Sequence, residues 1–284
     1  MLIDSTEQLH IIRDEIENKS VGFAPTMGNL HAGHLGLVEA SLKENDITFV
    51  SIFVNPTQFG PNEDFDKYPR TLEADFQKIE ELAKGYENKQ VWIYAPKSVK
   101  EIYPDNWDTK IEVPHLSNRL CGKSRPGHFP GVCTVVYRLF SLVRPHNSYF
   151  GQKDYQQCLI IKKMTEDLKL PVTVNMMPIS RDEDGLALSS RNQYLSPQER
   201  ERALELYHSI QSLKDMIEAD SYMSNEQQIK DFIANKLKDQ RWEYLEVLNA
   251  NNLERKINDD DDIVILGAFK LGQTRLIDNV VVKC

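Results

Sequence analysis

Short apolar runs alternate with amphipathic stretches over the first two-thirds of the chain. Residues 21–25 are apolar and predict a strand, and residues 35–43 have the spacing of an amphipathic helix. Residues 47–54 carry no charge, which is typical of a strand covered on both faces. A strand, a helix and a second strand in this order form one βαβ unit. The pattern therefore predicts an α/β fold with a parallel sheet flanked by helices.

The same alternation continues along this part of the chain, with one long interruption. Ser5 and Gln8 have the spacing of a capping box, which predicts a helix running to about residue 17. Residues 96–130 are rich in proline, glycine and asparagine and show little periodicity, so we expect a long irregular segment of mobile or functional character. The other expected elements are strands at residues 91–94, 148–150 and 172–176 and helices at 71–84 and 154–168.

From about residue 180 the order of elements changes. Ser196, Pro197 and Glu199 form a strong helix start, with serine at the N-cap and glutamate three residues after it. Because helices then precede strands, we expect a Rossmann-like domain over residues 1–179 and a smaller C-terminal α/β lid domain over 180–284. The expected elements are helices at 197–217 and 225–240 and strands at 244–248, 263–266, 275–277 and 280–282.

Composition and charge narrow the classes of function. With 284 residues and 40% hydrophobic content, the chain is long enough for two domains. A net charge of −9 and a pI near 5.4 provide no basic field for a polyanion, so nucleic-acid binding is not expected. Binding of a small phosphate compound neutralised by Mg²⁺ is compatible with this net charge, because a few positioned hydrogen-bond donors hold it locally. The acidic run at residues 259–262 is interpreted as a solvated turn rather than a metal site.

Cysteine usage and the absence of long apolar runs bear on location. Cys121, Cys133, Cys158 and Cys284 form no CxxC pair and have no metal-binding spacing with histidine. They are best interpreted as thiols in a reducing compartment. Residues 1–25 contain no signal-peptide core, and no run of about 18 apolar residues is present for a membrane span. We therefore expect a cytoplasmic protein that does not bind membranes.

The first chemical motif is Pro-Thr-Met-Gly-Asn-Leu-His-Ala-Gly-His at residues 25–34, where the first strand leads into a helix. Helix N-terminal N–H groups bind phosphates at such a junction, and glycine allows close approach of the backbone. His31 and His34 are expected to face one phosphate chain and to offset charge that develops on phosphorus. The alternatives are a zinc pair, which lacks a third ligand nearby in sequence, or two helix-capping histidines.

Two further motifs follow strand ends in the same half of the chain. Asn55 and Gln58 lie in Asn-Pro-Thr-Gln at the end of the second strand and supply neutral donors and acceptors for hydroxyl and carboxylate groups. The alternative is a simple turn, which by itself the sequence favours. Lys153 and Gln157 are four residues apart and are expected to share a helix face. The alternative there is an ordinary polar helix start in which Asp154 favours the helix dipole.

The last candidates combine hydroxyl and arginine side chains. Ser189, Ser190 and Arg191 end the motif Asp-Gly-Leu-Ala-Leu-Ser-Ser-Arg, and hydroxyls followed by a guanidinium suit a polyphosphate. The alternative is a serine-rich linker. Arg125 lies in Arg-Pro-Gly-His-Phe within the irregular segment and is interpreted as either a mobile phosphate clamp or a solvated loop charge.

Taken in this order, these motifs resemble the pantothenate synthetase family of the nucleotidyltransferase superfamily with the His-x-Gly-His signature. The specific motifs lie between residues 25 and 195, and the resemblance covers nearly the whole chain. It implies ATP-dependent condensation of pantoate with β-alanine through a pantoyl adenylate, with Mg²⁺, and with release of pyrophosphate and AMP. It also implies a homodimer with small-molecule substrates. Formation of an adenylate needs no covalent enzyme nucleophile, which accounts for the lack of a Ser-His-Asp or Cys-His arrangement.

The resemblance also implies roles for single residues. Gln58 and Gln157 would hold pantoate with help from Asn55, His34 would be the proton donor, and Asp75 would neighbour Mg²⁺. The implied catalytic residues are His31, His34, Arg125, Lys153, Ser189, Ser190 and Arg191. The implied ATP contacts are Met27, Gly28, Asn29, Leu30, His31, Ala32, Gly33, His34, Gly151, Gln152, Lys153, Asp154, Ser180, Leu188, Ser189, Ser190 and Arg191. Gln152 and Pro130 depart from the residues that the family usually carries.

Two rival functions stay open at the level of sequence. One is another adenylyl transferase with the same His-x-Gly-His signature, acting on a nucleotide monophosphate or on an amino acid and tRNA. The other is a nucleotide-binding protein without catalytic activity. The acidic charge disfavours tRNA. A mixed anhydride is destroyed by water, so the expected reaction also requires a lid and a loop that close over it.

Overall fold

The computed structural model describes residues 1–61, 63, 65–258 and 260–283. These residues form two compact units. The N-terminal unit comprises Met1–Gly151 and Gln157–Pro178, and the C-terminal unit comprises Gln152–Gln156 and the chain from Ile179 onward. A five-residue segment from the middle of the chain thus groups with the C-terminal unit. The division into functional domains at residues 179 and 180 stays a prediction.

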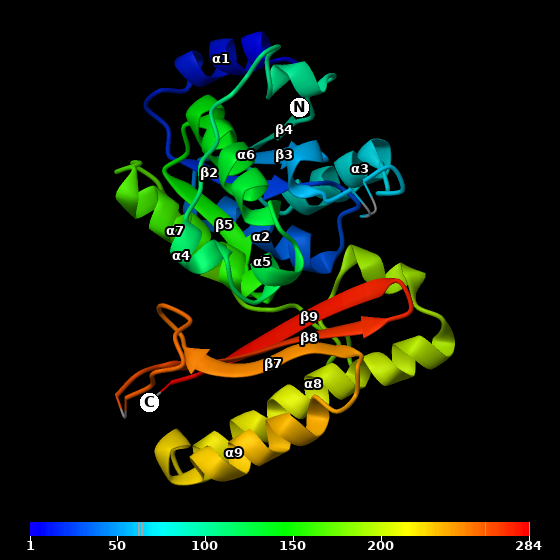
Figure 1. The fold of residues 1–284 in the computed structure, drawn as a ribbon. Coiled ribbons are helices and arrows are strands. Elements are labelled where there is room, and N and C mark those ends of the chain that lie inside the picture. The colour runs from blue at the N-terminus through cyan, green and yellow to red at the C-terminus, as the bar shows by residue number, and fades with distance from the viewer. Residues whose placement is uncertain (62, 64, 259, 284) are drawn as a thin grey trace. The chain divides into compact units, whose positions relative to one another are not determined.

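A six-stranded parallel sheet forms the centre of the N-terminal unit, which confirms the predicted α/β class (Figure 1). Its strand order is β1-β4-β3-β2-β5-β6. Strand β2 pairs with β3 on one side and with β5 on the other, so the chain reverses its direction of winding at β2. Ligands of open parallel sheets bind outside the carboxyl ends of strands at such a switch point. The strands are β1 (Leu2–Ile3), β2 (Val21–Thr26), β3 (Ile47–Ile52), β4 (Gln90–Tyr94), β5 (Asn147–Gly151) and β6 (Thr173–Met177).

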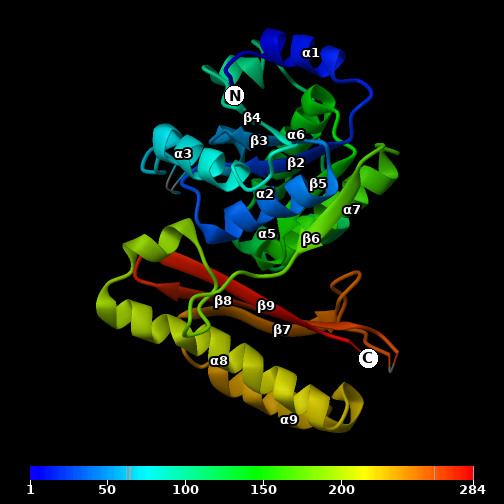
Figure 2. The same ribbon diagram turned by 180° about the vertical axis from the view of Figure 1, so that it is seen from behind.

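Helices cover both faces of this sheet. Helices α2 and α3 lie on one face and α6 lies on the other, as the two opposite views show (Figures 1 and 2). Leu37, Val38 and Leu42 of α2 are buried against Ala24 and Val50 of the sheet. The helices of this unit are α1 (Thr6–Glu15), α2 (Ala32–Glu44), α3 (Leu72–Ala83), α4 (Pro114–Ser117), α5 (Cys121–Ser124), α6 (His128–Val143) and α7, which begins in the other unit (Tyr155–Asp167).

Helix α6 is the main element that the sequence pattern failed to predict. Pro130 and Gly131 lie in its first turn, although these residue types are typical of a loop. Proline is tolerated there because the first N–H groups of a helix have no partner within the helix. Ten of its sixteen residues are buried, so the helix has little of the polar face that marks an amphipathic stretch. The predicted irregular segment therefore contains three short helical pieces and the start of α6.

The C-terminal unit packs two helices on one face of a three-stranded antiparallel sheet (Figure 2). The predicted capping box is confirmed, because Ser196 Oγ accepts from Glu199 N and Glu199 Oε2 accepts from Ser196 N. The two strands predicted at residues 275–277 and 280–282 are one strand, and the polar residues between them are buried. The elements are α8 (Pro197–Ala219), α9 (Tyr222–Lys236), β7 (Trp242–Asn249), β8 (Ile263–Leu271) and β9 (Thr274–Val282).

Three cysteines lie in the described part of the chain. Cys121, Cys133 and Cys158 are buried, and none forms a disulfide within the described residues. Burial raises the pKa of Cys133 to about 12, so this thiol stays protonated at neutral pH. Cys284 and the first residue of the acidic run, Asp259, lie outside the described residues. None of the described helices combines the length and the apolar character needed to cross a bilayer.

Candidate functional site

The loop after β2 has an unusual backbone. Gly28 and Asn29 both have positive φ, at 84° and 50°. A side chain at Gly28 would also approach Ile52 and Asp75 to 3.1 and 3.2 Å. Glycine and asparagine are the residues that adopt this left-handed conformation most readily. The loop is anchored at its start by Thr26, whose Oγ1 accepts from Gly28 N and donates to Ser51 O.

His31 and His34 cap the helix that follows this loop. His31 Nδ1 accepts from Gly33 N at 3.1 Å, and His34 Nδ1 accepts from His31 N at 3.3 Å. The helix-capping interpretation is therefore confirmed, and the two rings lie 4.0 Å apart between centroids. No group of three side chains suited to a metal is present among the described residues, so the zinc interpretation gains no support. With each Nδ1 acting as an acceptor, a neutral ring carries its proton on Nε2.

Asp75 supports this loop from the first turn of α3. Its carboxylate accepts from Asn29 N and Leu30 N at 2.8 Å each, and from Thr71 Oγ1 at 3.0 Å. The residue is 0% exposed. Lys78, one turn further along α3, donates to Leu30 O at 2.6 Å. Asp75 therefore does not fit the role of Mg²⁺ neighbour that the resemblance implies, because its oxygens are enclosed by protein donors.

Asn55 and Gln58 lie at the end of β3, next to the same loop. Gln58 Nε2 donates to Met27 Sδ at 3.1 Å, so the structure brings these two motifs together. Asn55 is buried and links several segments: its Oδ1 accepts from Tyr103 and its Nδ2 donates to Gln58 Oε1 and Gly131 O. The turn interpretation is correct for the backbone, since Asn55 caps a short 3₁₀ helix, η1 (Pro56–Gln58). Asn55 thus orients Gln58 from the protein interior.

Arg125 is paired within the protein rather than solvated in this structure, and its role as a phosphate clamp stays a prediction. Its guanidinium forms a two-pronged pair with Glu63, at 2.7 and 2.6 Å, and also contacts His128 Nε2 at 2.9 Å. His128 Nδ1 lies 2.8 Å from Gln58 O, which links the pair to the Asn-Pro-Thr-Gln motif. Burial alone would raise the pKa of the Glu63 carboxyl, but the hydrogen bond and charge of Arg125 outweigh it, so the pKa is lowered. No pattern along the chain had marked Glu63 or His128 as partners of Arg125.

Gln152 and Lys153 of the Gly-Gln-Lys-Asp segment belong to the C-terminal unit and are bonded to β9. Asn279 Nδ2 donates to Gln152 O at 2.9 Å and to Lys153 O at 3.0 Å, and its Oδ1 lies 3.3 Å from Gln152 Nε2. Lys153 belongs to a 3₁₀ turn, η3 (Gln152–Asp154), which directly follows β5, and α7 starts only at Tyr155. Lys153 therefore lies outside α7, and the predicted helix face shared with Gln157 is not formed. Asn279 was not predicted, because it lies 126 residues from Lys153.

The motif around Ser189 is an ordered turn rather than a linker. Arg181 and Ala187 form an antiparallel bridge, and Leu188 N donates to Ser180 O, so residues 180–188 double back on themselves. Ser189 then caps the 3₁₀ helix η4 (Ser190–Tyr194), with its Oγ accepting from Arg191 N at 3.3 Å. A two-pronged ion pair of Arg181 with the buried Asp278, at 2.7 and 2.8 Å, anchors this turn on β9.

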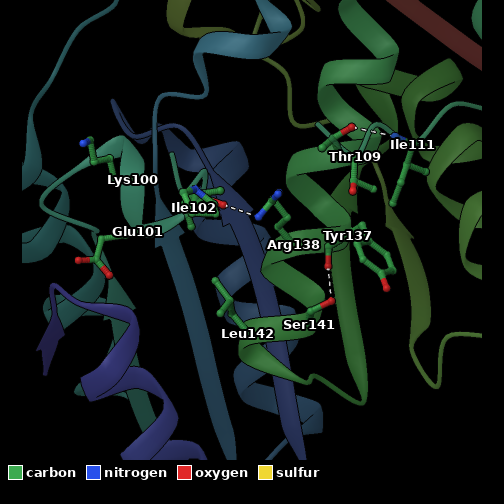
Figure 3. Close-up of a pocket in the computed structure, with 11 residues that line it drawn as sticks. Lys100, Glu101, Ile102, Thr109, Ile111, Tyr137, Arg138, Ser141 and Leu142 are labelled. Atoms are coloured by element: carbon green, nitrogen blue, oxygen red, sulfur yellow. Dashed lines mark hydrogen bonds between the residues drawn. The ribbon is translucent and has the colours of Figure 1, made fainter. Parts of the chain in front are cut away.

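A pocket of about 430 Å³ in the N-terminal unit lies apart from these motifs (Figure 3). Lys100, Tyr137 and Arg138 are among its lining residues, and Arg138 donates to Ile102 O at 2.7 Å. The guanidinium of Arg138 also lies 5.2 Å from the centre of the Tyr103 ring. None of the residues that the sequence motifs proposed for catalysis or binding lines this pocket.

Comparison with known proteins gives a consistent result. The family described as Pantoate-beta-alanine ligase matches residues 2–281. The chain is 46% identical to the pantothenate synthetase of Thermosipho africanus, over 99% of both chains. The crystal structure of pantothenate synthetase from Thermus thermophilus covers 98% of both chains with a TM-score of 0.85 and 38% identity. Pantoate-beta-alanine ligase from Francisella tularensis, complexed with beta-gamma ATP and beta-alanine, has a TM-score of 0.77 and 36% identity and covers 99% of this chain and 97% of its own.

Proposed function

This chain belongs to the pantoate–β-alanine ligase family, and we therefore propose that its separate motifs serve a single ATP molecule and a single pantoate. The enzyme condenses pantoate with β-alanine to pantothenate at the expense of ATP. A carboxylate is a poor acylating agent, so the reaction must first convert one pantoate oxygen into a leaving group. Transfer of AMP to that oxygen achieves this without a covalent enzyme intermediate.

The reaction consists of two balanced transfers. A pantoate carboxylate oxygen attacks the α-phosphorus of ATP, and the bond to the bridging oxygen of pyrophosphate breaks. The amine of β-alanine then attacks the pantoyl carbonyl, the bond to the AMP oxygen breaks, and the amine loses a proton. Catalysis depends mainly on alignment of the reacting atoms and on stabilisation of charge around the α-phosphate.

The two histidines supply hydrogen-bond donors for this charge. Each Nδ1 accepts a backbone N–H, so Nε2–H is the ring group that can donate to a phosphate oxygen. We assign His34 as the proton donor to the phosphate chain and His31 as its neighbour on the same chain. The backbone of residues 27–34 forms the cradle, because its N–H groups precede and begin a helix whose dipole favours negative charge.

Positively charged groups outside this loop complete the proposed phosphate site. Lys153 would contact the phosphates, with Gly151, Gln152 and Asp154 beside ATP. Residues 188–191 and Ser180 of the C-terminal unit would cover the phosphate chain as a lid. Arg125 would reach it only by exchanging Glu63 for a phosphate oxygen, since all three guanidinium nitrogens now have partners.

Gln58 and Gln157 are the proposed contacts for pantoate. An amide side chain donates to a carboxylate and accepts from a hydroxyl, and pantoate carries both groups. Asn55 assists indirectly by fixing Gln58. We propose that ATP enters as its Mg²⁺ complex, in which the cation is held by phosphate oxygens and water, as Mg²⁺ prefers.

The observation that carries this proposal is the sheet topology. Strands β2 and β5 are parallel neighbours, with Gly22 opposite Asn147 and Phe23 opposite Ser148. Their carboxyl ends lead directly into the His-x-Gly-His loop and the Gly-Gln-Lys-Asp segment, at the place where parallel sheets bind nucleotides.

Pyrophosphate exchange tests the proposal. The enzyme with ATP, Mg²⁺ and labelled pyrophosphate should return label to ATP only when pantoate is present, and without any need for β-alanine. Exchange that requires a different acid, or a nucleotide monophosphate, would assign the chain to another adenylyl transferase. An absence of exchange with binding of ATP retained would identify a nucleotide-binding protein without activity.

Location and assembly are further proposals. The buried thiols and the small soluble substrates support a cytoplasmic enzyme. The resemblance supports a homodimer, which light scattering would show as twice the chain mass of 32.8 kDa. The acidic pI supports the expectation that nucleic acid is not a partner.

A further inference from the structure

The backbone conformation of residues 28–30 depends on a hydrogen-bond acceptor for its N–H groups. Two consecutive left-handed residues, Gly28 and Asn29, precede the point where the N–H groups of Asn29 and Leu30 both donate to Asp75 of α3. Buried N–H groups need partners, and none of the described strands and helices supplies a backbone acceptor here. The carboxylate of Asp75 takes both, one with each oxygen, at 2.8 Å.

The position of the Leu30 backbone determines the position of the neighbouring signature histidine. Leu30 is followed by His31, the N-cap residue of α2. Lys78 holds the carbonyl of Leu30 at 2.6 Å, so two side chains of α3 fix the orientation of the peptide groups on both sides of this residue. Bonds from backbone N–H groups to a carboxylate are charge-assisted and directional. A loop that lost them would rotate at Asn29 and Leu30 and would displace the His31 ring.

We propose that Asp75 is a positioning residue for the phosphate-binding loop and not a ligand of Mg²⁺, an inference that rests on the proposed function of that loop. Mg²⁺ requires oxygens free to approach to about 2.0–2.1 Å in octahedral geometry. Asp75 is 0% exposed and accepts three hydrogen bonds from protein groups. A role in geometry accounts for its burial, its position in the first turn of α3 and its three partners together.

The substitution Asp75→Asn separates the two roles. The amide keeps one accepting oxygen but presents an NH₂ group to the other backbone N–H, so one loop contact becomes repulsive. We expect kcat/KM for ATP to fall at least tenfold, with KM for pantoate and the half-saturating Mg²⁺ concentration each within twofold of the wild type. The matched control is Glu73→Gln, which changes an exposed acidic residue of the same helical turn and should leave all three quantities unchanged.

Two other results of this experiment would overturn the proposal. A Mg²⁺ requirement that rises tenfold or more, with activity restored by excess Mg²⁺, would make Asp75 a metal ligand. Kinetics equal to those of the wild type would show that the loop holds its shape without the carboxylate. If the wild type itself fails to use pantoate, the proposed function fails instead. Hydrogen exchange of residues 27–34, expected to be faster in Asp75→Asn, would then still test the positioning role.

Thr71 provides a second test if Asp75→Asn does not fold. Its hydroxyl donates to Asp75 Oδ2 at 3.0 Å, and that carboxylate connects it to the loop. Thr71→Val should lower kcat/KM for ATP by about threefold and leave the Mg²⁺ dependence unchanged, whereas Thr71→Ser should retain wild-type kinetics. Equal activity of both variants would contradict a positioning role for this carboxylate.

Discussion

The two nitrogens of each signature imidazole have separate tasks. Nδ1 accepts a backbone N–H and so fixes both the ring plane and the tautomer, which directs the proton to Nε2. Each ring therefore caps a helix N-terminus and at the same time presents a donor. This division explains why a pair of helix-capping residues can also be catalytic, so the two interpretations of the sequence are not exclusive.

His34→Asn distinguishes the two tasks. The asparagine oxygen takes the place of Nδ1 and preserves the cap on His31 N, but no donor replaces Nε2. We expect the rate to fall at least ~100-fold, the usual size of a general acid contribution, with the melting temperature nearly unchanged. His10→Asn, at an exposed position of α1, is the control. A fall in stability that parallels the loss of rate would show that capping was the only role.

Asn279 is the second residue-scale prediction. It is buried in β9 and holds the two carbonyls of Gln152 and Lys153, so it fixes the backbone that carries the lysine proposed to contact the phosphates. Asn279→Ala should lower kcat/KM for ATP about tenfold, or about 1.4 kcal/mol of transition-state stabilisation, with little change in KM for pantoate. Asn235→Ala, at an exposed position of α9, should be neutral. Equal losses for both substrates would point to general loosening of the unit.

The sequence singles out candidate reactive side chains, but it does not reveal the residues that hold them in place. His31, His34 and Lys153 stand out because their motifs follow strand ends. Glu63 and Asn279 do not, because each meets its partner only in the folded chain, 62 residues away for Arg125 and 126 for Lys153. A buried amide or carboxylate within an ordinary helix or strand carries no local pattern to mark it.

At the scale of elements, the approach of α6 to η1 leaves no space beside the motif proposed to bind pantoate. A side chain at Gly131 would lie 2.2 Å from Thr57 O and 2.8 Å from Gln58 Cα. The helix therefore contacts the backbone that carries Gln58 with no space between them. Asn55 joins the same two elements through its bond to Gly131 O.

Gly131→Ala should separate α6 from η1. Both elements would have to shift, which typically costs about 1–3 kcal/mol of unfolding free energy, and KM for pantoate should rise because Gln58 moves. The control is Gly36→Ala in α2, where an added methyl meets nothing within 4 Å. That variant should gain about 0.5–1 kcal/mol from helix propensity. Urea unfolding and initial rates measure both effects, and an unaltered KM with Gly131→Ala would contradict the role of this contact.

The Glu63–Arg125 pair joins the segment after η1 to the end of α5, and its contribution to stability should depend on pH. The pKa of Glu63 is lowered from its ordinary value of 4.5, so in acid the unfolded chain binds more protons than the folded one. The stabilisation is present above pH 4.5 and is lost as the pH falls through the lowered folded value. Glu63→Gln should cost about 1 kcal/mol at pH 7 and almost nothing well below about pH 4. A cost that is independent of pH would exclude the ion pair as its source.

Helices and strands were predicted correctly where apolar and polar residues alternate with a clear period. They were missed or divided where burial on several sides leaves no such alternation. The capping box at Ser196 and strands β2 to β6 lie close to where the pattern placed them. At Ser5 only half of the predicted box forms, because Ser5 Oγ accepts from Gln8 N while the Gln8 side chain accepts from Asp4 N, and the two-residue strand β1 was not predicted. Helix α6 was missed because it is apolar on most sides and carries proline and glycine in its first turn. Strand β9 was split in two because Asp278 and Asn279, which are paired and buried, resemble turn residues in the sequence.

For the whole molecule, the sheet order supports the proposal that motifs far apart in sequence serve one reaction. The strand reversal at β2 places the carboxyl ends of β2 and β5 next to each other, and the two motifs proposed to bind phosphate follow those ends. The alternation of strands and helices predicted the class of fold. The strand order itself is set by long-range packing, which no local pattern records.

The proposed reaction requires the His-x-Gly-His loop, Lys153 and the Ser189–Arg191 turn to act on the same phosphate chain. A crystal structure of the enzyme after soaking with ATP, Mg²⁺ and pantoate, without β-alanine, would show whether they do. We expect density for a pantoyl adenylate with His34 Nε2 and Lys153 Nζ within hydrogen-bond distance of its phosphate and Gln58 at the pantoyl group. An adenylate bound away from His34, or ATP held with Lys153 and Arg191 on a separate surface, would contradict this reaction scheme.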